Sequence, residues 1–147
     1  MELDKRLSEV SPVEFRLDPD SGVPPYMQLV RQVEDALRLG YLVRGDRLPK
    51  VKEVVAALAI NPNTVLKAYR ELEHKGLAAG RPGQGTFIQA SVDVVPLRDV
   101  HALRQGITRW LEEAAAAGLD DEAISALFTS ALYDLRRGRH AKATSAS

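Results

Sequence analysis

The sequence contains no cysteine. Disulfide frameworks, thiolate zinc sites and cysteine nucleophiles are therefore excluded. Its apolar runs fall far short of the roughly 20 residues that a membrane-spanning helix needs, so we expect no membrane segment. Residues 1–10 mix acidic and basic side chains and lack the apolar stretch of a signal peptide. These absences favour a cytoplasmic protein.

The common arrangements of catalytic and metal-binding residues are also missing. His74, His101 and His140 have no mutual spacing typical of metal ligands, and no HExxH motif or nucleophile–base pair occurs. The segment Gly83-Gln84-Gly85 lacks the third glycine, the preceding strand and the following helix of a dinucleotide site. We therefore expect no enzymatic activity, no metal and no cofactor.

The chain as a whole has no net charge, because its 20 basic and 20 acidic side chains cancel. The distribution is uneven, however. Residues 44–85 contain eight basic and four acidic side chains, whereas residues 1–20 contain three basic and six acidic ones. An excess of this size is a modest signal for nucleic acid binding, so charge alone does not decide the function.

The residues before position 40 predict a strand and a helix. Residues 1–13 are weakly patterned and are interpreted as an N-terminal arm, after which Phe15 and Leu17 alternate with charged neighbours as in a short strand. Pro25 then opens a helix, since proline at the first helical position costs no hydrogen bond. Apolar side chains recur at helical spacing as far as Leu37, and Gly40 is expected to end this helix.

Two further helices follow at close spacing. The second is predicted from about residue 50 to residue 58. The third starts with Asn61 as its N-cap and Pro62 at its first position, directs Tyr69 into the core and ends at Gly76. The few residues between these two helices are typical of a helix-turn-helix.

A short hairpin is predicted after the third helix. Strand candidates at 77–80 and 86–89 flank a glycine-rich segment, 81–85. Three helices followed by such a hairpin, or wing, form a winged helix-turn-helix. The predicted fold class is therefore mainly α with a small β-hairpin, and the predicted DNA-binding domain spans residues 14–90.

The C-terminal part predicts two helices in the region 97–138, followed by a disordered tail at 139–147. The first helix spans about 97–117, and the second begins after Asp120 as N-cap and ends at Gly138. Their apolar faces are too wide for an isolated antiparallel pair, which favours contact with a second copy. Two alternatives stay open: the pair packs on its own winged helix and leaves a monomer, or a cleft beside it holds an unknown small-molecule effector. The candidate dimerisation residues are Leu103, Ile107, Trp110, Leu111, Leu127, Phe128 and Leu132.

Several short motifs carry a resemblance to a known family. Over about Val23 to Ile88 the chain resembles the GntR family of bacterial transcription regulators. The motifs that carry this resemblance are Pro25-Tyr26-Met27-Gln28-Leu29, Gly45-Asp46-Arg47-Leu48-Pro49, Asn61-Pro62-Asn63-Thr64-Val65, Tyr69-Arg70-Glu71-Leu72-Glu73 and Gly83-Gln84-Gly85-Thr86-Phe87. The third motif and the short helical tail are most similar to the YtrA-type branch.

The resemblance implies a dimeric DNA-binding regulator, most simply a repressor on an inverted-repeat operator. In this fold the third helix enters the major groove and the wing approaches the backbone or the minor groove. An alternative function is a winged-helix protein-docking module without DNA binding. The candidate DNA contacts are Lys50, Lys52, Asn61, Asn63, Thr64, Lys67, Arg70, Arg81, Gly83, Gln84 and Gly85.

Some of these residues also have simpler interpretations. Asn61 could act as a helix cap alone, the basic side chains could be solvated, and Arg47 could pair with Asp46 or Glu53. The chain also departs from the family pattern. Lys50 and Lys52 stand where relatives usually have serine and arginine, so a base contact at Lys52 is less expected than a phosphate contact. Pro62 and Leu66 replace arginines that many relatives carry.

Overall fold

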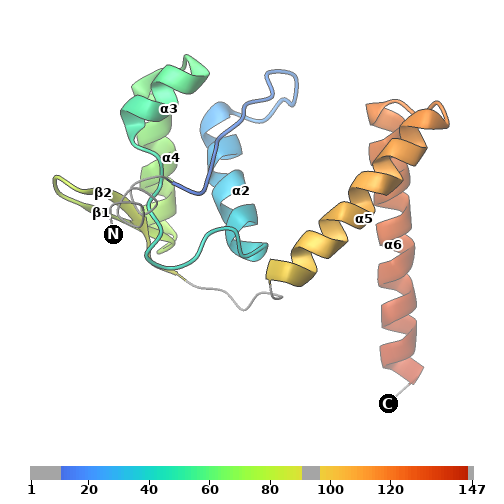
Figure 1. The fold of residues 1–147 in the computed structure, drawn as a ribbon. Helices are drawn as coiled ribbons and strands as arrows, with labels where there is room; N and C mark the ends of the chain where they lie inside the picture. Colours follow the sequence, from blue (N-terminus) through green and yellow to red (C-terminus); the bar gives the residue numbers. More distant parts are fainter. Residues whose placement is uncertain (1–10, 91–96, 146–147) are drawn as a thin grey trace. The chain divides into compact units, whose positions relative to one another are not determined.

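The computed structural model describes residues 11–90 and 97–145, which form two compact units that divide near Val100 (Figure 1). The first unit holds α2 (Pro25–Arg38), α3 (Val51–Leu58), α4 (Pro62–His74), β1 (Ala78–Arg81) and β2 (Gly85–Ile88). The second holds most of α5 (Leu97–Ala116) and all of α6 (Asp121–Ser145). Three helices followed by an antiparallel hairpin confirm the predicted winged helix-turn-helix and its mainly helical fold class.

Helix α4 is the centre of the first unit, because it packs against α2, α3 and β1. Tyr69 of α4 is buried, as the sequence predicts. Burying one Val, Leu or Ile side chain stabilises the fold by about 1.5–3 kcal/mol, so this interior fixes the helices firmly. Its most completely buried large side chains are Leu29, Val33, Leu42, Leu48, Val65, Leu72 and Ile88.

The wing is joined to the segment that precedes α3. The amide of Leu48 donates to the carbonyl of Thr86 (2.8 Å), and the amide of Ile88 donates to the carbonyl of Asp46 (2.8 Å). Arg47 therefore pairs with Phe87 in an antiparallel bridge at the free edge of β2. The hairpin lies about one residue from its predicted position, and it projects on the side of the α3–α4 pair away from α2 (Figure 1).

The strand predicted around Phe15 is wrong. The segment that contains Phe15 is extended but pairs with no other strand among the described residues. Instead, the side chain of Gln32 on α2 bonds both the amide and the carbonyl of Arg16, at 2.9 and 2.6 Å. A glutamine amide offers the donor and the acceptor of a neighbouring strand, so the segment satisfies its backbone without one. The Phe15 side chain is buried in the core.

The ends of the helices in the first unit follow the predicted signals. Gly40 has φ +78°, and the bonds from the Gly40 amide to Leu37 and from the Tyr41 amide to Ala36 end α2. At the turn between α3 and α4, Ala59 adopts the left-handed conformation. The carboxamide oxygen of Asn61 accepts a hydrogen bond from the Asn63 amide at 2.8 Å, which confirms the predicted N-cap.

The helices of the second unit are mostly exposed. Asp120 caps α6 through the amide of Ala123 (2.8 Å), as predicted. Ala114 is the one buried residue of this unit within the described part of the chain. The predicted end of the helix at Gly138 and the disordered tail beyond it are wrong as far as Ser145, because α6 continues to that residue. One glycine costs a helix about 1 kcal/mol, and the arginine, alanine and lysine residues around it are good helix formers.

Candidate nucleic-acid interface

The outer face of α4 carries a polar stripe. Val65, Ala68, Tyr69 and Leu72 face the core, which leaves the opposite side of the helix exposed. Asn63, Lys67 and Arg70, spaced at helical intervals, are all exposed there. Leu66 is also exposed on this side, with 37% of its surface accessible. A helix with a buried inner stripe and such an outer face is suited to enter a groove of DNA.

The two asparagines at the start of α4 differ in how they are used. The side chain of Asn61 caps the helix, so its oxygen is already engaged. The side-chain amide of Asn63 makes no hydrogen bond with the described residues, while its backbone amide is satisfied by the cap. Asn63 therefore presents both a donor and an acceptor at the exposed end of the helix.

Lys67 and Thr64 are more constrained. The ammonium of Lys67 lies 4.1 Å from the centroid of the Tyr26 ring on α2, a cation–π contact that holds the side chain across the α2–α4 junction. Thr64 is half-buried, and its amide donates to the Asn61 carbonyl at 3.0 Å. Both residues lie on the first two turns of α4, close in sequence to Asn63.

A basic crevice of about 670 Å³ lies between the wing and the residues before α3. Arg47, Lys50 and Arg81 supply its charged side chains, and no carboxylate of the described residues lines it. Arg81 stacks on Phe87, with 4.4 Å between the guanidinium carbon and the ring centroid. The rest of the lining is Gly80, Pro82, Gly83, Gln84, Gly85 and Thr86. The structure thus brings the predicted wing residues and Lys50 to one crevice, whereas Lys52 is exposed and does not line it.

Arg47 also lines this crevice, whereas the sequence offered an ion pair with Asp46 or Glu53 for it. Among the described residues it has no such pair. The carboxylate of Asp46 accepts from the Val43 amide (2.9 Å), and that of Glu53 accepts from the Lys50 amide (3.3 Å). Only the tertiary pairing with Phe87 places Arg47 beside the wing, and nothing in the local sequence signals that pairing.

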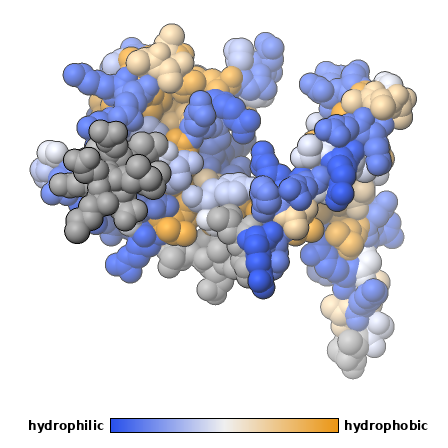
Figure 2. Space-filling view, in the orientation of Figure 1, coloured by the Kyte–Doolittle hydropathy of each residue, from blue (hydrophilic) through white to orange (hydrophobic). Residues whose placement is uncertain are grey.

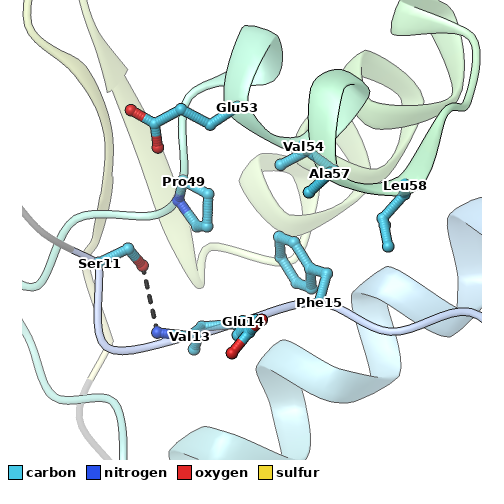
Figure 3. Close-up of a pocket in the computed structure, with 9 residues that line it drawn as sticks. All are labelled: Ser11, Val13, Glu14, Phe15, Pro49, Glu53, Val54, Ala57 and Leu58. Carbon is cyan, nitrogen blue, oxygen red and sulfur yellow. Dashed lines mark hydrogen bonds between the residues drawn. The ribbon is translucent and has the colours of Figure 1, made fainter.

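A second hollow, of about 460 Å³, lies between the extended segment 11–15 and α3 (Figure 3). Phe15, Val54 and Leu58 give it apolar walls. Its charged lining residues are the carboxylates Glu14 and Glu53. A hollow with this charge repels phosphate, so it is not part of a nucleic-acid surface.

The described residues offer neither a metal site nor a membrane span. Within residues 11–90 and 97–145, no three histidine or carboxylate side chains are grouped so that they could hold a metal ion. In that same part of the chain, every helix is too short or too polar to cross a membrane.

Comparison with known proteins decides the family. The family model described as bacterial regulatory proteins, gntR family, matches residues 25–88. The HTH-type transcriptional repressor YtrA of Bacillus subtilis is 29% identical over 126 residues, which cover 85% of this chain and 97% of that protein. The uncharacterized HTH-type regulator YhcF of the same organism is 32% identical over 102 residues, covering 69% and 84%. The chain belongs to the GntR family, in its YtrA-like branch.

A solved structure is similar over most of this GntR-family chain. A transcriptional antiterminator from Listeria monocytogenes EGD-e is 28% identical, with a TM-score of 0.54 over 84% of this chain and 93% of that one. Members of the family are DNA-binding transcriptional regulators, so this chain is a DNA-binding regulator. Because regulators of this kind are not enzymes, the comparisons confirm the expectation that the chain has no enzymatic activity.

Proposed function

We propose that this GntR-family chain is a cytoplasmic, homodimeric repressor that binds an inverted-repeat DNA operator. The observation that carries the proposal is the exposed polar stripe of α4, with the unengaged Asn63 carboxamide at its start. A carboxamide bonds adenine through two parallel hydrogen bonds in the major groove. Lys67 and Arg70, further along the stripe, contact the backbone, and the wing contacts the backbone or the minor groove.

The residues of the proposed interface divide into two roles. Base edges specify a sequence, whereas phosphate contacts position the protein on it. We assign base contacts to Asn63, with Thr64 at a thymine methyl or a phosphate. Asn61, whose side-chain oxygen caps the helix, offers its side-chain amide nitrogen as a further donor. Phosphate contacts are assigned to Lys50, Lys52, Lys67, Arg70 and the wing residues Arg81, Gly83, Gln84 and Gly85.

Dimerisation is assigned to the α5–α6 unit. Apolar side chains stay at the surface of this unit (Figure 2), with Leu103 71% exposed and both Leu127 and Phe128 46% exposed. Exposed apolar surface of this kind is typical of an interaction site. A second copy of the same unit offers a matching apolar surface, and two-fold symmetry suits an inverted repeat. The proposed contacts are Leu103, Ile107, Trp110, Leu111, Leu127, Phe128 and Leu132.

Repression is the regulatory mode that the similarity to the B. subtilis repressor supports. The alternative of a protein-docking module calls for an apolar recognition face. On α4 only Leu66 among the large apolar side chains is notably exposed, and it lies among Asn63, Lys67 and Arg70. The polar surroundings favour DNA. A small-molecule effector stays a prediction of the sequence.

The first experiment is a selection of bound duplexes from a random DNA pool at near-physiological salt, followed by sequencing. We expect enrichment of an inverted repeat, because two α4 helices of a symmetric dimer read the same half-site twice. Enrichment of a single half-site would contradict the dimer. Absence of any enriched sequence would contradict sequence-specific binding.

The Asn63→Ala variant tests the base-reading role on the enriched sequence. We expect it to lower the ratio of specific to random-duplex affinity by about tenfold, since one bidentate base contact contributes about 1–3 kcal/mol of discrimination. The matched control is Arg70→Ala on the same stripe, which should weaken both affinities alike. An equal loss on both duplexes for Asn63→Ala would assign that residue to the backbone instead. Titrations of the labelled specific and random duplexes with the wild type and both variants measure these affinities.

A further inference from the structure

The register of the wing places two arginines on the same face of its sheet. Gly85 pairs with Arg81 across the hairpin, and Phe87 pairs with Arg47 at the other edge of β2. Directly opposed residues in an antiparallel pair point to the same side, as do residues two apart on one strand. The guanidinium groups of Arg47 and Arg81 therefore share a face with Gly85 and Phe87.

Gly85 provides the space that Arg47 occupies. The residue has φ +124°, a backbone conformation that other side chains rarely adopt. A Cβ placed on it would stand 3.2 Å from Nε and 3.4 Å from one terminal nitrogen of Arg47. Any larger residue at this position would push the guanidinium group aside.

The positive charges around Gly85 have no ion-pair partner among the described residues. The ion pairs among the described residues join Lys75 to Glu34 and Arg98 to Asp99, and none includes Arg47, Lys50 or Arg81. Nε of Arg47 is buried and makes no hydrogen bond within the described part of the chain, the only side-chain nitrogen or oxygen there in that condition. Glu73 lies beside Gly80, with Oε1 3.4 Å from the position of a Cβ on that glycine, but it does not line the crevice.

We propose that Arg47 is a further DNA-binding residue, which with Arg81 and Lys50 forms a clamp for one backbone phosphate at the base of the wing. The inference rests on the proposed DNA binding and adds a residue to it. Three cations in a crevice that no described carboxylate lines attract an anion, and a planar guanidinium fork matches the oxygens of a phosphate. Gly85 acts in this clamp by making room for Arg47.

Arg47→Gln tests the clamp through the salt dependence of binding. The probe is a fluorescently labelled random-sequence duplex of about 20 base pairs, because a phosphate contact does not depend on sequence. We expect about tenfold weaker binding and a slope of log affinity against log salt that is shallower by about 0.9. The control, Arg38→Gln, removes an exposed arginine at the end of α2 and should keep the wild-type slope.

Two more variants show whether Arg47 binds a phosphate or only supports the fold of the wing. Arg47→Lys keeps the charge but loses the fork, so it should retain the wild-type slope with several-fold weaker binding. Gly85→Ala keeps every charge yet displaces Arg47, and it should weaken binding although circular dichroism shows a folded protein. If Arg47→Gln keeps the slope of Arg38→Gln while the wild type binds DNA, the clamp is wrong and the proposed function stands. If the wild type itself shows no salt-dependent binding to duplex, both are wrong.

Discussion

The Tyr69 side chain ties α4 to the start of α3. Its hydroxyl donates a hydrogen bond to the carbonyl of Pro49, and its ring packs at 6.5 Å from that of Phe15. Burial raises the pKa of the Tyr69 hydroxyl above its ordinary value, and the nearby carboxylate of Glu53 raises it further. The folded protein therefore holds this hydroxyl neutral in alkaline solution.

The proton of the Tyr69 hydroxyl makes the free energy of unfolding depend on pH. The unfolded chain releases the tyrosine proton near pH 10, whereas the folded chain retains it, so stability falls as pH rises above about 10. We expect Tyr69→Phe to lower the free energy of unfolding by about 1 kcal/mol at pH 7, through the lost hydrogen bond. The difference in the free energy of unfolding between variant and wild type should narrow above about pH 10, because phenylalanine has no hydroxyl proton to lose.

Urea unfolding at pH 7 and at about pH 10.5 measures both effects. Tyr41→Phe, at a half-buried position without a hydroxyl hydrogen bond among the described residues, serves as the control for the general effect of alkali. If Tyr69→Phe lowers the free energy of unfolding by the same amount at both pH values, the Tyr69 hydroxyl is not held neutral by burial.

At the residue scale, local chemistry was a good guide wherever the partner lies nearby in sequence. The N-cap at Asn61, the helix end at Gly40 and the buried position of Tyr69 all follow from patterns within a few residues. Arg47 could not be assigned in this way. The wing residues that it meets in the crevice lie about 35–40 residues further along the sequence, and the bridge to Phe87 forms only after the wing folds back.

At the element scale, the Phe15 segment and α6 show where pattern reasoning fails. Alternating side chains predicted a strand, but the Gln32 side chain of α2, and not another strand, provides the pairing partner. Gly138 predicted a helix end, but a glycine ends a helix by adopting a positive φ, and Gly138 does not have one. A glycine such as Gly138 therefore allows a helix to end but does not force it to end.

The extension of α6 through Gly138 can be measured directly. Apart from the adjacent backbone of its own helix, no atom of the described residues lies within 4 Å of a Cβ placed on Gly138, so alanine fits without a clash. Because alanine favours a helix over glycine by about 1 kcal/mol, we expect Gly138→Ala to increase the helical signal in circular dichroism and to delay its loss on heating. Gly106→Ala, at an equally open helical position in α5, is the reference for the size of the gain. No change for Gly138→Ala beside a clear gain for Gly106→Ala would place the helix end before residue 138.

At the scale of the whole molecule, the two units divide the proposed work. The first unit has a dense apolar core and presents its polar residues on α4 and the wing. The second has almost no interior of its own within the described residues, since Ala114 alone is buried there. Two helices with so little interior gain stability mainly by packing against a partner surface. Because the proposed dimer binds both half-sites of one operator, we expect dimerisation and DNA binding to depend on each other.

Phe128→Asp tests that dependence at an exposed position of α6. Because 46% of the phenylalanine surface is accessible in the single chain, aspartate should leave the fold of one copy intact while opposing its burial against another. We expect the dimer to weaken by about 2 kcal/mol or more, roughly thirtyfold in dissociation constant, as for an aromatic residue central to an interface. Analytical ultracentrifugation over a concentration series measures this shift.

Val43→Asp is the matched control, because Val43 is 51% exposed and lies in the first unit. It should sediment as the wild type does. If Phe128→Asp also sediments unchanged, the apolar face of α6 is not the dimer contact. On DNA, Phe128→Asp should lose affinity for a duplex with both half-sites of the selected operator and keep its affinity for one half-site, since each α4 still reads its own groove. Equal losses on both duplexes would mean that α6 supports the recognition surface itself and not the pairing of two copies.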